Sequence, residues 1–124
     1  MRSLRLVAIL LALSLMIGEL WRSWGAGRAA VFVLDDQLMG GFLIAGAVGV
    51  RDDTRRNRAA FSAAWGVVAG MLYGSFFGKI VAPATAQPGN WDLGILTALL
   101  GLAFATALLG LWFSIVLPPT REHG

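Results

Sequence analysis

The sequence predicts an all-α, polytopic membrane protein in which four transmembrane helices form an antiparallel, up-down-up-down bundle. Hydrophobic residues make up 57% of the 124 positions before the 16 glycines are counted, whereas a soluble domain reaches about 45–50% with glycine included. Charged residues make up only 14% of the chain, and they are gathered in short stretches. This composition excludes both a soluble enzyme and a disordered tail.

The apolar residues form four long segments, at residues 4–21, 29–50, 59–81 and 93–117. At about 1.5 Å per residue, segments of this length approach or exceed the 30 Å of a hydrocarbon core. The links between them are short, and short links join antiparallel neighbours. We therefore expect residues 1–124 to form one integral membrane domain.

The first segment has the features of either a signal peptide or a retained membrane anchor. Two arginines precede its apolar run, as they would in a signal peptide. The residues that follow include Glu19, Trp21, Arg22 and Trp24, and they do not form the small-residue pair that a signal peptidase needs. The sequence therefore favours a retained helix.

The second segment carries Asp35 and Asp36, and it allows two helix starts. A helix that starts at Ala29 places both aspartates inside the membrane, about 9–10 Å from its outer end. A helix that starts at Leu34 places them in its first turn, where carboxylates stabilise the helix dipole in contact with water. The sequence alone leaves both alternatives open.

The third segment has a row of small residues that recurs every four positions. Such a row allows two helix backbones to approach closely in a right-handed, glycine-zipper crossing. We expect the row to contact a helix of this chain or of another, and the bulky residues on another side to face lipid. The small row is Ser62, Gly66, Gly70, Gly74 and Gly78, and the bulky set is Phe61, Trp65, Val68, Leu72 and Phe76.

The fourth segment carries no charge, and Pro118-Pro119 ends it. After a turn at Pro88-Gly89, Asn90 or Asp92 is placed to cap its start. A second set of small residues follows a spacing of four, three and four positions, which predicts a narrow helix-packing seam. This seam consists of Gly94, Ala98, Gly101 and Ala105.

The basic residues predict the orientation of the bundle. Seven of the ten Lys and Arg residues lie at the N-terminus, in the second link or at the C-terminus, so both termini should be cytoplasmic. Nine of the ten basic residues are arginine, which suggests a GC-rich bacterial genome, so we expect the membrane to be the inner membrane of a bacterium. The cytoplasmic link carries Arg51, Arg55, Arg56 and Arg58. Two aspartates dilute this cluster and no aromatic residue interrupts it, so no nucleic acid is expected as a partner.

Polar residues of the outer half suggest one candidate site for protons or cations. Intramembrane acids are costly and often mark ion pathways. The candidate residues are Glu19, Asp35 and Asp36, with the Tyr73 hydroxyl facing protein as a hydrogen-bonding partner. In the alternative interpretation, Glu19 pairs with Arg22 at i,i+3 and the aspartates cap a helix.

The chain lacks the usual side chains of catalysis. It has no cysteine, and its one histidine is the second-last residue, so neither a catalytic centre nor a cofactor is expected. We therefore predict a non-enzymatic accessory or assembly subunit that acts through glycine-mediated helix packing. Its partners would be the lipid bilayer and other membrane subunits or copies of itself. The alternative is a small oligomeric transporter or channel that uses the outer carboxylates.

Overall fold

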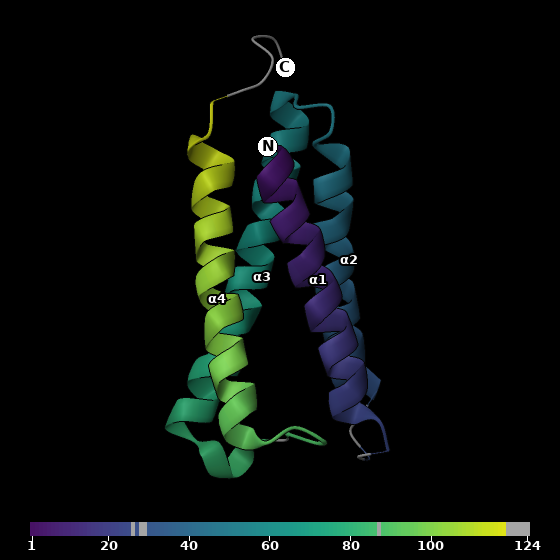
Figure 1. Cartoon of the computed structure of the whole chain (residues 1–124), viewed down its shortest axis with the longest axis vertical. Coiled ribbons are helices and arrows are strands. Elements are labelled where there is room, and N and C mark those ends of the chain that lie inside the picture. The colour runs from purple at the N-terminus through teal and green to yellow at the C-terminus, as the bar shows by residue number, and fades with distance from the viewer. Residues whose placement is uncertain (26, 28–29, 87, 119–124) are drawn as a thin grey trace.

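The computed structural model describes residues 1–25, 27, 30–86 and 88–118 of the chain. Within them the chain is all-helical, as predicted, and forms four long helices (Figure 1). These are α1 (Arg2–Ser23), α2 (Ala30–Gly49), α3 (Arg55–Val81) and α4 (Leu93–Val116), with a short 3₁₀ turn, η1 (Pro83–Thr85), after α3.

Successive helices run in opposite directions, so the molecule is an elongated antiparallel bundle (Figure 1). Helix α2 packs against α1 and α3, and α3 packs extensively against α4, whereas α1 and α4 barely touch. The N-terminus, the α2–α3 link and the end of α4 share one end of the bundle, which we call the N-terminal end. The α1–α2 and α3–α4 links lie at the opposite, far end.

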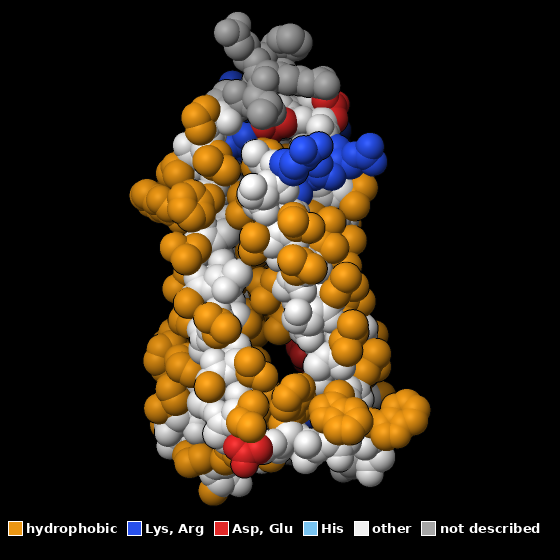
Figure 2. Space-filling model, in the orientation of Figure 1, with side chains coloured by type: hydrophobic (Ala, Val, Ile, Leu, Met, Phe, Trp, Pro, Cys, Tyr) orange, Lys and Arg blue, Asp and Glu red, His pale blue; other side chains and the backbone are white. Residues whose placement is uncertain are grey.

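Within the described residues, α1, α3 and α4 are long and apolar enough to cross a membrane. Apolar side chains cover most of the visible surface between the two ends (Figure 2). These properties are compatible with a membrane protein. Insertion, orientation and the crossing of the membrane by α2 stay predictions.

Side-chain caps fix the starts of two helices. The Thr54 hydroxyl accepts a hydrogen bond from the Asn57 N–H at 3.1 Å, so α3 begins at Arg55, one turn before its apolar segment. An Asp92 carboxylate oxygen accepts from the Ile95 N–H at 3.1 Å and caps α4. Of the two caps considered for α4, Asp92 is therefore the one used.

The bulky side of α3 faces the core of the bundle, and the prediction that this side faces lipid is wrong. Phe61, Trp65 and Val68 are fully buried, Leu72 nearly so, and Phe76 is half-buried. They have room because neighbouring helices present glycines at two of the contacts: Gly46 of α2 lies against Phe61, and Gly110 of α4 lies against Trp65. In a chain that is apolar on every side, this match of large to small decides which face turns inward.

Close helix contacts occur at glycines outside α3. A Cβ atom on Gly110 of α4 would lie 2.6 Å from the indole of Trp65, and one on Gly101 would lie 2.6 Å from Phe76 Cε1. On α2, a Cβ on Gly40 would lie 2.5 Å from Met16 Cγ of α1, and one on Gly46 would lie 3.2 Å from Phe61 Cα of α3. At these four positions the neighbouring helix approaches closely because glycine has no side chain.

Candidate functional sites

The small-residue row of α3 faces away from the rest of the bundle. No heavy atom of a neighbouring residue lies within 4 Å of a Cβ built on Gly66, Gly70, Gly74 or Gly78. We call these four positions the glycine face. Among the predicted row, Ser62 does contact α4, since its hydroxyl lies 2.9 Å from that of buried Ser114. Among the described residues the glycine face therefore contacts no other helix, and its contact with a helix of another chain stays a prediction.

The predicted seam of α4 is likewise mostly outside the bundle contact. Ala98 and Ala105 are exposed, and Gly94 lies beside the Asp92 cap, so only Gly101 meets α3. The small residues of α4 that pack inward are Ala103, Ala107, Gly110 and Ser114. They repeat the same spacing of four, three and four positions. The sequence therefore contains two equivalent seams, and spacing alone does not say which one is used.

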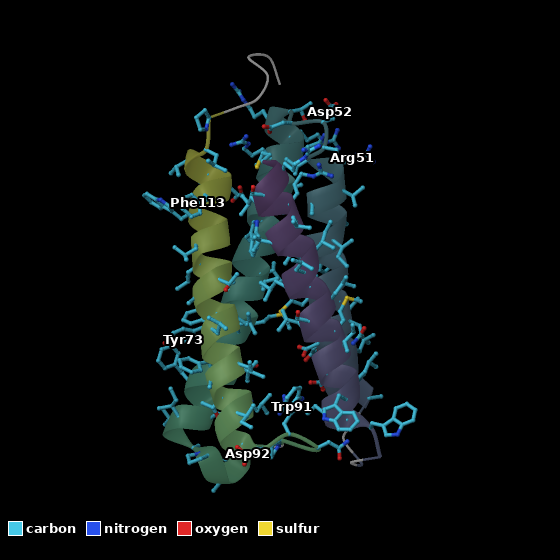
Figure 3. All side chains as sticks on the ribbon, in the orientation of Figure 1. Arg51, Asp52, Tyr73, Trp91, Asp92 and Phe113 are labelled. Atoms are coloured by element: carbon cyan, nitrogen blue, oxygen red, sulfur yellow. The ribbon has the colours of Figure 1, made fainter. Side chains whose placement is uncertain are left out.

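Tyr73 does not join the candidate proton or cation site. Its side chain is 58% exposed, and its ring packs with Phe77 and Phe104 at centroid distances of 4.9 and 5.9 Å. Figure 3 places Tyr73 on the outside of the α3–α4 pair, away from Trp91 and α1. The prediction that its hydroxyl faces protein is wrong. Tyr73 lies on the same side of α3 as the glycines, and that side faces outward.

The three predicted acids occupy three different environments. Glu19 is only 3% exposed; its carboxylate accepts a hydrogen bond from the Ser23 hydroxyl at 3.0 Å and lies 3.6 Å from Arg22 Nη1. The i,i+3 pair with Arg22 is therefore formed. Helix α2 begins at Ala30, close to the earlier of the two expected starts, so Asp35 and Asp36 lie in its second turn.

Helix rotation separates the two aspartates. Asp35 is exposed, whereas Asp36 is half-buried. The next residue, Gln37, turns toward α1 and donates a hydrogen bond from its side-chain amide to the Met16 carbonyl at 3.1 Å. Glu19 and Asp36 are thus brought to one site, and Asp35 and Tyr73 are not.

Glu19 and Asp36 meet at a cavity of about 340 Å³ between α1 and α4. We call it the α1–α4 cavity. Figure 2 shows a hollow between the two columns of side chains, with acidic atoms visible inside it. Its walls are apolar, with Leu11 and Leu15 on α1 and Leu99 and Ala103 on α4. Trp91 and Arg22, which lies 3.6 Å from Glu19, also line it.

The link before α4 closes the far end of this cavity. Asn90 donates from its side-chain amide to the Trp21 and Trp24 carbonyls at 2.8 and 2.6 Å, and from its backbone N–H to the Arg22 carbonyl at 3.2 Å. The Trp91 indole N–H donates to the Gly18 carbonyl at 3.1 Å (Figure 3). We call residues 88–92 the strap, because they join α4 to the end of α1.

Gly89 is required by the shape of the strap. Its φ of 59° lies in the left-handed region, and a Cβ there would fall 1.8 Å from the Arg22 carbonyl oxygen. Sequence reasoning found the Pro88-Gly89 turn but missed the strap. The only available signal was a turn sequence followed by Asn90 and Trp91, two residues with side-chain N–H donors.

The N-terminal end carries the predicted basic cluster, and one member of it has a structural role. Arg58 binds both carboxylate oxygens of Asp53 and donates to the Leu117 carbonyl, so it ties α3 to the end of α4. Arg51, Arg55 and Arg56 are exposed. Basic side chains gather at this end in Figure 2.

Within the described part of the chain, no three His, Asp or Glu side chains lie close enough together to hold a metal ion. No protein-family model, curated protein or solved structure matches the chain. The functional argument therefore depends on the glycine face and the α1–α4 cavity themselves.

Proposed function

We propose that the protein is a non-enzymatic membrane subunit that binds a helix of another subunit, or of a second copy, through the glycine face of α3. The observation that carries this proposal is the open space at all four glycines, Gly66, Gly70, Gly74 and Gly78, while the opposite side of the same helix is buried. The packing within this chain makes no use of these four regularly spaced glycines.

The physical reason is that glycine is a poor choice for a helix surface without a partner. Each glycine costs about 1 kcal/mol in helix propensity relative to alanine. A second helix that packs on the glycine face gains backbone contacts, because no side chain holds the two axes apart. The face extends over three helical turns, about 18 Å, which matches the contact length of a crossing helix pair.

We place the protein in the inner membrane of a bacterium, with both termini in the cytoplasm. Support comes from the apolar length of α1, α3 and α4 and from the exposed Arg51, Arg55 and Arg56 at the end that also holds the N-terminus. Basic residues are retained on the cytoplasmic side. A phosphatase reporter fused after Gly124 is expected to be inactive, and periplasmic activity would overturn this orientation.

The absence of cysteine from the sequence allows a direct test of the glycine face. We would place one cysteine at Gly74 and, as a matched control, one at Gly41, an open glycine on α2. Oxidation in native membranes is expected to give a disulfide-linked dimer for Gly74→Cys only if the partner is a second copy.

A photo-reactive residue at Tyr73, beside the glycine face, tests for a different subunit. The expected result is one cross-linked product of defined mass that disappears when Gly70 and Gly74 are both replaced by leucine and persists in Gly41→Leu. The absence of both the dimer and the product, in cells where the protein is inserted, would overturn the proposed function.

A further inference from the structure

We propose that the α1–α4 cavity is a binding site for a small, single-tailed amphiphile with a cationic amine head group. This inference goes beyond helix association, and it rests on the membrane location proposed above. Its basis is the combination of an apolar cavity, two carboxylates in the lining of that cavity and a strap that closes the far end.

The walls of the cavity favour an apolar tail. Leucines of α1 and α4 are the most numerous residues of the lining. The two hydroxyl-bearing residues of the walls, Ser14 and Thr106, donate to carbonyls of their own helices, Leu10 at 2.7 Å and Leu102 at 2.9 Å. The walls therefore offer a ligand few hydrogen bonds. The volume of about 340 Å³ lies near the lower end of the range for small-molecule sites, about 300–1,000 Å³.

The charged end of the cavity favours a cation. Its ionisable lining residues are Glu19, Asp36 and Arg22, two acids and one base. Glu19 already binds Arg22 and Ser23. A carboxylate nevertheless has about four acceptor positions on its two oxygens, so both acids can share these oxygens with the N–H groups of an ammonium. An anionic head group would instead meet two like charges and only one opposite charge, Arg22, which already pairs with Glu19.

The route into the cavity is lateral. The strap covers the far end, where Trp91 and Asn90 bind backbone carbonyls of α1. Along the bundle, α1 and α4 barely touch, and the hollow between them opens to the side in Figure 2. A ligand that enters by this route must first dissolve in the surrounding bilayer, which an amphiphile does.

A bilayer phospholipid fits this site less well than a single-tailed amine. Its phosphate would lie beside Glu19 and Asp36 and be repelled by them, and the one cation of the lining, Arg22, already pairs with Glu19. It would also bring two acyl chains to a cavity near the lower size limit for small molecules. The charge and the volume therefore point to one tail and one positive charge.

The test uses protein reconstituted in vesicles and a photo-reactive alkylamine that carries a diazirine in its tail. We expect its label on cavity-lining peptides of α1 and α4, located by mass spectrometry. Octylamine should compete with the label, whereas octanol and octanoate, at the same mole fraction in lipid, should compete about tenfold less, as a charge-assisted hydrogen bond requires. Equal competition by octanol and octylamine would overturn the cationic preference, and labelling spread evenly over the bundle would overturn the site.

Two matched pairs of variants locate the effect. Asp36→Asn should reduce the preference for octylamine over octanol about tenfold, from loss of one charged acceptor, whereas Asp35→Asn, at the exposed neighbour, should leave it unchanged. Gly18→Leu should block labelling, because Gly18 lines the cavity and a Cβ there meets only Trp91, at 3.9 Å. Gly41→Leu, at an open glycine of α2, should have no effect. If either pair behaved alike, with native helix content, the assignment would be wrong.

The binding site and the proposed membrane location can fail separately. Release of the protein from vesicles by alkaline carbonate would contradict the membrane location. Loss of amine-selective labelling in protein that resists carbonate would contradict the binding site. The cross-links at Gly74 and Tyr73 test the subunit function independently of both.

Discussion

The two sides of α3 use opposite kinds of residue, and the side with the larger residues is the one inside. Phe61, Trp65 and Val68 fill the centre of the bundle, whereas Gly70 and Gly74 face outward with open space around them. Because both sides are apolar, polarity gives no preference for either. The comparison teaches that a glycine row leaves space for another backbone, and that it does not by itself indicate which side of a helix faces the core of its own bundle.

The largest effect is expected from the buried side. Trp65→Ala removes a fully buried ring and should lower the free energy of unfolding by about 3–5 kcal/mol. Equilibrium unfolding in detergent, followed by helix content, would measure it. Trp112→Ala on α4, where the side chain is 61% exposed, should change the stability much less. Equal losses from the two variants would mean that α3 is rotated from the orientation described.

A comparison of two glycine-to-leucine changes distinguishes the glycine that contacts α3 within the bundle from a glycine of the outward glycine face. Gly110→Leu would force a side chain into the Trp65 indole and should cost about 1–3 kcal/mol in unfolding free energy through overpacking. Gly70→Leu should leave that free energy unchanged or slightly higher, because its Cβ meets open space. The same measurement on both proteins suffices, and a larger loss for Gly70→Leu would reverse our assignment of the faces.

The polar contact at the edge of the buried side should have a smaller effect. Ser114→Ala removes the hydrogen bond between the Ser62 and Ser114 hydroxyls and should lower the unfolding free energy by about 1 kcal/mol. Ser75→Ala, at an exposed serine of α3, is the matched control and should be silent. A silent Ser114→Ala would show that the contact adds nothing to α3–α4 packing.

The smallest effect is expected from Trp65→Phe. Within the described part of the chain, the buried Trp65 Nε1 has no hydrogen-bond partner. Removal of this N–H avoids the cost of burying an unpaired donor, about 1–3 kcal/mol, and this gain offsets the weaker packing of the smaller phenyl ring. The net change in unfolding free energy should be near zero. A loss as large as that of Trp65→Ala would indicate that the indole N–H binds a water molecule in the core.

The helices and their order could be predicted from the sequence because they follow from long apolar runs and local caps. Asp92 caps α4 through a contact three residues away, and Glu19 pairs with Arg22 over the same spacing. Such contacts depend only on the geometry of one helix. The cap and the ion pair could therefore both be predicted from the sequence.

The rotation of each helix could not be predicted, and most of the site depends on it. Asp35 and Asp36 are adjacent in sequence, yet only Asp36 lines the α1–α4 cavity. Tyr73 faces outward and the bulky set faces inward, the reverse of what was expected for each, because a single rotation of α3 places both. Sequence patterns determine rotation when one side is polar, and α3 has no polar side in its apolar segment.

The strap also determines when the first helix can be completed. The last carbonyls of a helix have no partner within it. The Arg22 carbonyl accepts from the Asn90 N–H, and the Trp21 carbonyl accepts from the Asn90 side chain in addition to the Trp24 N–H; Asn90 lies 69 positions after Trp21. During synthesis, the hydrogen-bond donor for the end of α1 therefore comes from a segment made after α2 and α3. Its closing turn becomes fully hydrogen-bonded only when α4 begins, so the earliest helix made is among the last to be finished.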